Sequence, residues 1–255
     1  MEFILIILFI IGSVFGSFFY VVGTRLPKGE SIVSPGSHCE NCNHSLKWYE
    51  LIPIISYIIQ GGKCRKCKSK ISFTYTLIEI ITGLLFAISF YLYGFSYEFY
   101  ACIIILSLLV LIFITDFKYM IILDSPLIIS SVLILLLKWY FFGIKTMLLS
   151  LLSGVIIFAL MFAVLKIGNI IFKRESLGGG DVKLSFVIGV VLGFKLSLAS
   201  LILSSFLAFP YAFAVMYLGN DKELPFGPFL ASSMVIIFLF MDKFTDLIYF
   251  LFPSI

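Results

Sequence analysis

Residues 99–115 read FYACIIILSLLVLIFIT and contain no charged side chain, and Asp116 follows directly. A bilayer core about 30 Å thick is crossed by about 20 helical residues, so this stretch is typical of a membrane-spanning helix. Six more apolar runs of comparable length follow the same pattern: residues 3–23, 73–93, 121–142, 146–165, 196–218 and 226–241. An eighth run, from Leu184 to Phe194, is too short to cross unless its helix begins at Asp181.

The composition agrees with this interpretation along the whole chain. Of 255 residues, 61% are hydrophobic and 13% are charged, whereas soluble domains have about 45–50% apolar and about 25% charged residues. The same figures exclude a disordered chain, and five cysteines are too few for a secreted disulfide scaffold. A net charge of +4 does not favour nucleic-acid binding. The sequence predicts an all-α polytopic membrane protein with about eight transmembrane helices.

Lysine and arginine placement predicts the orientation. With the N-terminus outside and eight spans, all but four of the 18 basic residues fall on the cytoplasmic side, as the positive-inside rule requires. The four exceptions are Lys138, Lys145, Lys195 and Lys243. Both termini are therefore expected outside. We expect a first transmembrane helix at 1–23, with a Gly12-x-x-x-Gly16 spacing that allows close helix approach, a cytoplasmic loop domain at 24–72, and a seven-helix membrane domain at 73–255.

The loop between the first two spans contains a candidate metal site. Cys39 and Cys42 form one C-x2-C pair, and Cys64 and Cys67 form a second after 21 intervening residues. Two such pairs place four thiolates at the corners of a tetrahedron, which suits Zn²⁺. A four-cysteine site has no open coordination position, so it predicts a structural metal and excludes metal-based hydrolysis.

Other interpretations of the cysteines are weaker. Two disulfides would not persist in a reducing cytoplasm. His38 and His44 flank the first pair and are expected to be loop residues instead of ligands. Cys102 lies in an apolar run and is expected to be a small core residue.

Four carboxylates lie in or beside apolar runs, where a charge costs about 2.5–3.5 kcal/mol at a helix centre. They are Glu79, Asp116, Asp124 and Asp181. The predicted topology brings the three aspartates to the cytoplasmic face. Two carboxylates held close together share a proton, which is the chemistry of aspartic peptidases. Gly178, Gly179 and Gly180 before Asp181 would let a substrate strand approach the backbone.

The alternative is that these acids are helix caps or solvated interfacial residues, because Asp is favoured at helix N-termini. Asp124 fits that alternative better than Asp116 or Asp181 does. Glu79 is equally compatible with a structural and a functional role.

Several of these motifs together resemble the type IV prepilin peptidase family, the bifunctional leader peptidase and N-methyltransferase of pilus, competence and type II secretion systems. The resemblance covers nearly the whole chain. It rests on Gly16-Ser17-Phe18, Arg25-Leu26-Pro27, the two cysteine pairs, Gly178-x-Gly180-Asp181-x-Lys183 and Leu224-Pro225-Phe226-Gly227-Pro228. One departure is Leu123, where the family usually has proline, and this weakens any role for Asp124.

The resemblance implies that Asp116 and Asp181 are the catalytic pair of a Gly-x-Gly-Asp membrane peptidase in the inner or plasma membrane. Gly178, Gly179, Gly180, Lys183 and Glu79 would support or bind substrate, and Cys39, Cys42, Cys64 and Cys67 would hold the metal.

The resemblance also implies a reaction. A prepilin or pseudopilin would be cleaved after the terminal glycine of its leader, on the cytoplasmic side, and the new N-terminus methylated with S-adenosylmethionine. The chain carries no nucleotide-binding motif of the strand–glycine–helix type, so the methyltransferase activity rests on the resemblance alone. The competing classes are a presenilin-type peptidase, a transporter or channel, and a metal-sensing scaffold. A transporter would place acids across the midplane, whereas these gather at one face.

Overall fold

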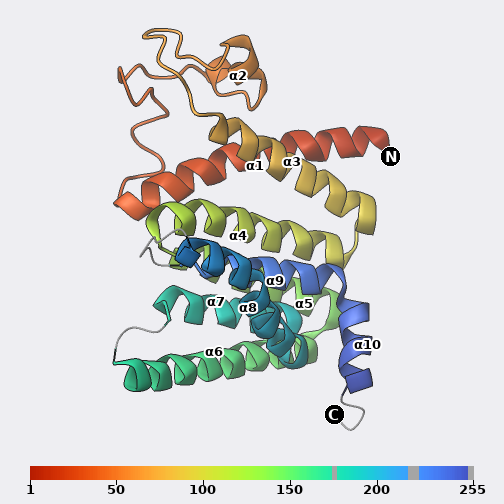
Figure 1. Ribbon diagram of the computed structural model, residues 1–255. Coiled ribbons are helices and arrows are strands. Elements are labelled where there is room, and N and C mark those ends of the chain that lie inside the picture. The colour runs from red at the N-terminus through yellow and green to blue at the C-terminus, as the bar shows by residue number, and fades with distance from the viewer. Residues whose placement is uncertain (174–176, 218–223, 252–255) are drawn as a thin grey trace. The chain divides into compact units, whose positions relative to one another are not determined.

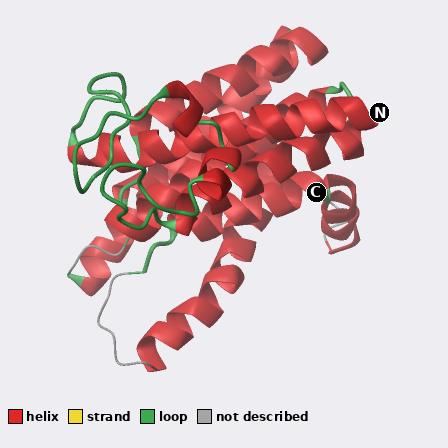
Figure 2. Cartoon of the chain, turned by 90° about the horizontal axis from the view of Figure 1, so that it is seen from above, coloured by secondary structure: helices red, strands yellow, loops and turns green. Residues whose placement is uncertain are grey.

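The computed structural model describes residues 1–173, 177–217 and 224–251. Within these ranges it consists of helices joined by loops, with no strand and two isolated β-bridges, His38–Ser45 and Lys63–Lys70 (Figures 1 and 2). The helices are α1 Glu2–Arg25, α2 Ile55–Ile59, α3 Phe73–Tyr93, α4 Tyr97–Tyr119, α5 Asp124–Phe142, α6 Ile144–Phe172, α7 Gly179–Leu192, α8 Phe194–Tyr217, α9 Gly227–Leu239 and α10 Met241–Leu251, with short 3₁₀ helices η1 Leu26–Lys28 and η2 Trp48–Glu50. The all-α prediction is confirmed.

Six of the described helices, α1, α3, α4, α5, α6 and α8, are long and apolar enough to cross a membrane. A seventh span results if α9 and α10, which meet at an angle of 88°, are counted together. The remaining apolar run is α7, which begins at Gly179, two residues before Asp181, and has 14 residues. At 1.5 Å per residue it is about 21 Å long, too short to cross a bilayer core alone.

The chain divides into two compact units, Met1–Ile114 and Thr115–Ile255, with the boundary inside α4. The boundaries predicted at residues 23 and 72 separate membrane spans from the cysteine loop, whereas these units are defined by contacts within each of them. The predicted boundaries therefore stay a prediction. Each unit is described separately below.

In the first unit, α1 packs along α3 (Figure 1). Glycines allow this close approach: a Cβ added to Gly12 would lie 2.8 Å from the Cα of Gly83, and one added to Gly16 would lie 2.9 Å from the Thr82 hydroxyl. The predicted Gly12-x-x-x-Gly16 contact surface therefore lies against α3. Residues 26–72, between these two helices, form the loop that contains the cysteines.

In the second unit, α7 is the central helix and contacts α5, α6, α8 and α9. Ten of its 14 residues are buried. Its last carbonyls have no intrahelical partners, and the Nζ of Lys138 on α5 donates to the carbonyls of Val190 and Val191 at 2.8 and 3.0 Å and to the Ser150 hydroxyl at 2.8 Å. A buried cation therefore caps α7 at the end opposite Asp181, which positions the whole helix.

Two helix ends differ from the apolar runs. Helix α4 continues to Tyr119, so Asp116 lies inside its last turn instead of following it. The run at 226–241 ends as a helix at Leu239, and the chain then turns into α10. In both places the end of the apolar run in the sequence differs from the end of the helix.

Candidate functional site

Asp116 is a buried carboxylate, 6% exposed, near the C-terminal end of α4. Its Oδ2 atom accepts a hydrogen bond of 3.1 Å from the backbone N–H of Gly227, the first residue of α9. Pro228 follows in the first turn, and the Pro-Phe-Gly-Pro segment thus brings a backbone donor to this acid. This hydrogen bond joins the C-terminal end of α4 to the start of α9.

Asp181 is the second buried carboxylate, 7% exposed, in the first turn of α7. Its Oδ1 atom is buried and has no hydrogen-bond partner among the described residues. Burial, and after it the negative charge of Asp116, raise the pKa of Asp181 to about 7. The two aspartates therefore interact electrostatically, which is the condition for a pair of carboxyl groups that shares one proton.

The three glycines before Asp181 have different surroundings. A Cβ added to Gly180 would lie 2.9 Å from the Cβ of Ile122, in the link between α4 and α5. A Cβ on Gly178 would lie 3.0 Å from Oδ2 of Asp181, and one on Gly179 would meet nothing within 4 Å. Gly180 therefore lets the start of α7 approach the α4–α5 link, while Gly179 faces open space.

Asp124 begins α5 and stays outside the buried pair. Both of its carboxylate oxygens accept from the Nζ of Lys183, at 2.7 and 2.8 Å, and both side chains are more than half exposed. Lys183, two residues after Asp181, thus ties the first turn of α7 to the start of α5. The three predicted aspartates come to one end of the second unit, but only Asp116 and Asp181 are buried.

The four predicted metal ligands in the first unit converge. Their sulfur atoms all lie within 4.8 Å of one another, with Cys39–Cys67 at 3.8 Å and Cys42–Cys64 at 4.0 Å. Around Zn²⁺, with Zn–S bonds of about 2.3 Å, tetrahedral sulfurs are about 3.8 Å apart, so the spacing fits such an ion.

The two cysteine pairs have the same backbone turn. In the first, the N–H of Cys39 donates to the carbonyl of His44, and Asn43 donates back to Cys39. In the second, Cys64 donates to Ser69, and Lys68 donates back to Cys64. Asn43 and Lys68 occupy equivalent positions with positive φ, 53° and 61°.

The chemistry of the thiols also suits a cation. The Ser69 hydroxyl, 3.0 Å from Sγ of Cys67, lowers the pKa of that thiol to about 5. The N–H of His44 acts to lower the pKa of Cys42, but burial and the neighbouring thiols outweigh it and raise that pKa to about 11. Four thiols this close do not all ionise by themselves, whereas a divalent cation among them would stabilise four thiolates.

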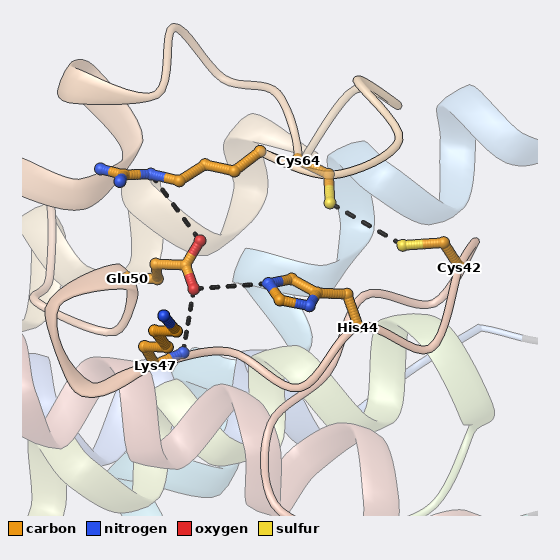
Figure 3. Close-up of polar contacts among 6 residues, drawn as sticks. Cys42, His44, Lys47, Glu50 and Cys64 are labelled. Atoms are coloured by element: carbon orange, nitrogen blue, oxygen red, sulfur yellow. Dashed lines mark hydrogen bonds and ion pairs between the residues drawn. The ribbon is translucent and has the colours of Figure 1, made fainter.

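Glu50 joins the two cysteine pairs and was not predicted as a site residue (Figure 3). Its side chain is 2% exposed, and its Oε2 atom accepts from the N–H of Lys47 at 2.9 Å and lies 3.7 Å from Nε2 of His44. Its Oε1 atom lies 3.7 Å from Nε of Arg65, which directly follows Cys64. In the sequence, Glu50 could have been identified as an acid between the two cysteine pairs that directly follows Trp48 and Tyr49.

Glu79 belongs to the first unit and lies on α3. Its Oε2 atom accepts from the N–H of Ile54 at 2.8 Å, and the Ser17 hydroxyl of α1 also bonds to it. Glu79 thus connects the loop to both helices that carry it.

Comparisons with known proteins identify the family of this chain. The bacterial peptidase A24 N-terminal domain matches residues 10–93, and the type IV leader peptidase family matches residues 103–213. A prepilin leader peptidase/N-methyltransferase of Bacillus subtilis is 35% identical over 246 residues, covering 93% of this chain and 94% of the relative. A protein of the same name from Vibrio cholerae is 31% identical, covering 93% of this chain and 98% of the relative. No solved structure matches.

The chain belongs to the type IV leader peptidase family. The resemblance inferred from the motifs is therefore confirmed. The boundary between the two family domains, residues 94–102, falls in the α3–α4 link and the start of α4. The cysteines lie in the N-terminal domain and both buried aspartates lie in the region of the peptidase domain.

Proposed function

We propose that this family member removes the leader from type IV prepilins or pseudopilins, cleaving after the leader's terminal glycine, and methylates the new N-terminus. Relatives over nearly the full length are named for both activities. The observation that carries the peptidase assignment is the pair of buried carboxylates, Asp116 and Asp181, with one oxygen of Asp181 unpartnered among the described residues. A catalytic acid leaves such an atom for its reactant.

The environments of the two acids assign their roles in peptide hydrolysis. Asp116, whose Oδ2 atom accepts from the Gly227 N–H, takes a proton from a water molecule whose oxygen attacks the scissile carbonyl carbon. Asp181 gives its proton to the carbonyl oxygen, which forms a diol. The diol then collapses: Asp116 passes its proton to the leaving nitrogen, a diol hydroxyl returns a proton to Asp181, and the C–N bond breaks. The pair ends in its starting protonation state.

The substrate would reach this pair from the cytoplasm. The excess of basic residues in the loop at 24–72 supports this orientation, with the N-terminus outside and that loop inside. The end of the second unit that carries Asp116, Asp124 and Asp181 then faces inward. A prepilin whose apolar helix lies in the bilayer would present its leader there.

Zn²⁺ is the metal that Cys39, Cys42, Cys64 and Cys67 would hold, because tetrahedral four-thiolate coordination suits it. When bound it would supply a structural cross-link between the two cysteine pairs. The hydrolysis uses only the two carboxylates and water.

Methyl transfer would use S-adenosylmethionine as donor. When bound, it would supply the methyl group that the nitrogen of the new N-terminus accepts in exchange for a proton. The amine must be neutral to attack, and a reference pKa of about 7.7–8.0 means that modest desolvation suffices. The protein must therefore hold this amine away from water after cleavage.

Gel mobility of a co-expressed prepilin tests the peptidase assignment. Wild-type protein should convert the prepilin to the faster-migrating mature form, and Asp181→Ala should leave it unprocessed. Asp181→Asn keeps the size of the side chain, and its membrane accumulation controls for folding. Full processing by the Asp181→Asn variant would overturn the assignment.

A further inference from the structure

The loop of the first unit exposes an apolar surface beside its cysteines. Helix α2 directs Ile55, Ile58 and Ile59 outward, with exposed fractions of 54, 68 and 69%. Leu51 and Ile52, just before it, are also exposed. We call these five side chains the isoleucine face. Large apolar side chains exposed together within nine residues indicate a surface that lipid or another protein covers.

Contacts with α3 define where this face lies along the membrane normal. The N–H of Ile54 donates to Glu79, six residues into α3, which is about 9 Å from Phe73 along the helix axis. The ring of Tyr57 contacts the ring of Phe73, with centroids 5.9 Å apart. Residues 51–59 therefore run beside the first turns of α3, where this membrane-spanning helix begins (Figure 1).

The isoleucine face continues a lipid-facing surface. Helix α3 exposes a stripe of large apolar side chains at intervals of three and four residues, the spacing of one helix face: Phe73, Leu77, Ile81, Leu84 and Ile88. In a membrane-spanning helix such a stripe faces lipid. Tyr57 joins α2 to the first residue of the stripe, so the apolar surface extends from α3 onto the loop.

The surrounding charges suit anionic lipid headgroups. Lys63, Lys66 and Lys68, in and around the second cysteine pair, are exposed. Cytoplasmic leaflets carry negative surface potential, and each lysine near that surface is attracted to it. An apolar face followed closely by lysines is typical of segments that lie in the membrane interface.

We infer that the isoleucine face inserts into the membrane–water interface and anchors the cysteine module, residues 37–71, to an anionic bilayer. The backbone supports this arrangement, because Ile54 has φ of 64°, a conformation that a β-branched residue rarely adopts, and its N–H is held by Glu79. The anchor holds the module at a constant height beside α3.

Tryptophan fluorescence tests this anchor. The chain has two tryptophans, Trp48 and Trp139, which are replaced by phenylalanine before Ile58→Trp is introduced. The full-length protein is reconstituted at one molecule per nanodisc. The nanodiscs contain phosphatidylethanolamine and phosphatidylglycerol with plain or brominated acyl chains. Brominated lipid should remove most of the Ile58→Trp emission, and aqueous iodide should have little effect.

Val33→Trp is the matched control in the same loop. Val33 is 82% exposed. It lies between Ser31 and Pro35, whose carbonyls accept hydrogen bonds from Arg25 at the end of α1. The ring of Tyr20 on α1 contacts the ring of Tyr75 near the start of α3, so Arg25 lies beyond that start, on the aqueous side. Val33→Trp should therefore be quenched by iodide and retain its emission in brominated lipid.

Three results would overturn the anchor. Iodide quenching of Ile58→Trp without lipid quenching would place the face in water. Protection from both quenchers would mean that protein covers it. Lipid quenching that appears only after a prepilin is added would make it a substrate surface. These measurements need no cleavage, so they stay informative if the proposed function fails.

Discussion

The cysteine module and the aspartate pair are built in opposite ways. Each cysteine pair closes its own turn through backbone hydrogen bonds spanning a few residues, and its sulfurs have donors such as the Ser69 hydroxyl. The aspartates come from α4 and α7, with two helices between them in the chain, and Asp116 takes its donor from α9. One oxygen of Asp181 has no partner among the described residues. A structural site satisfies its ligands locally, whereas a catalytic site uses distant elements to hold an atom ready for a reactant.

The largest expected effect is the loss of leader cleavage when the aspartate pair is changed while the cysteine module is left intact. Asp116→Asn should reduce leader cleavage by about 10²–10⁴-fold, because general acid–base catalysis contributes that much, and should still permit methylation of a mature pilin. Mass spectrometry of pilin N-termini, with synthetic mature pilin as acceptor, measures both. If Asp116→Asn binds mature pilin normally but does not methylate it, the two activities depend on one site.

Removing one predicted metal ligand tests the cysteine module. Purified protein should contain about one equivalent of Zn²⁺, and Cys64→Ser should lose most of it because the closed site needs four ligands. Metal analysis and limited proteolysis of the loop measure the result, with Cys102→Ser as the matched control outside the cluster. Methylation should fall at least as much as cleavage. Retained zinc and an intact loop in Cys64→Ser would contradict the metal assignment.

The glycines before Asp181 give a smaller and more local effect. Gly180→Ala should destabilise the protein by about 1–3 kcal/mol, because the new methyl group would overlap Ile122. Cleavage should fall with it, since the first turn of α7 carries Asp181. Gly179→Ala is the matched control, because a Cβ there meets nothing within 4 Å. Thermal unfolding in detergent and a cleavage assay measure both variants, and equal losses would contradict this packing argument.

The smallest effect is expected at the exposed ion pair. Asp124→Asn removes one partner of Lys183, and exposed pairs of this kind contribute about 1 kcal/mol or less. Cleavage should therefore stay within about fivefold of wild type, measured as initial rates on one prepilin. A loss as large as that of Asp116→Asn would place Asp124 in the catalytic pair.

Some features were predictable from the sequence because they depend on short-range patterns. An apolar run such as residues 73–93 became α3 with the same bounds, since backbone groups in lipid must satisfy each other within a helix. The C-x2-C spacing was sufficient to predict the two pairs of ligands, because each pair needs only its own turn. The motif at Asp181, together with the cysteine pairs and the Pro-Phe-Gly-Pro segment, was sufficient to indicate the family, which the comparisons confirm.

Other features depend on contacts that no local pattern contains. Which acids are buried was decided by packing: Asp116 meets the start of α9, whereas Asp124 meets Lys183 at the surface. The burial of α7 follows from its position among four helices, and the role of Glu50 follows from two cysteine pairs meeting around it. Helix formation and metal-ligand spacing are set by neighbours in sequence, whereas burial and hydrogen-bond partners are set by segments that meet only when the chain folds.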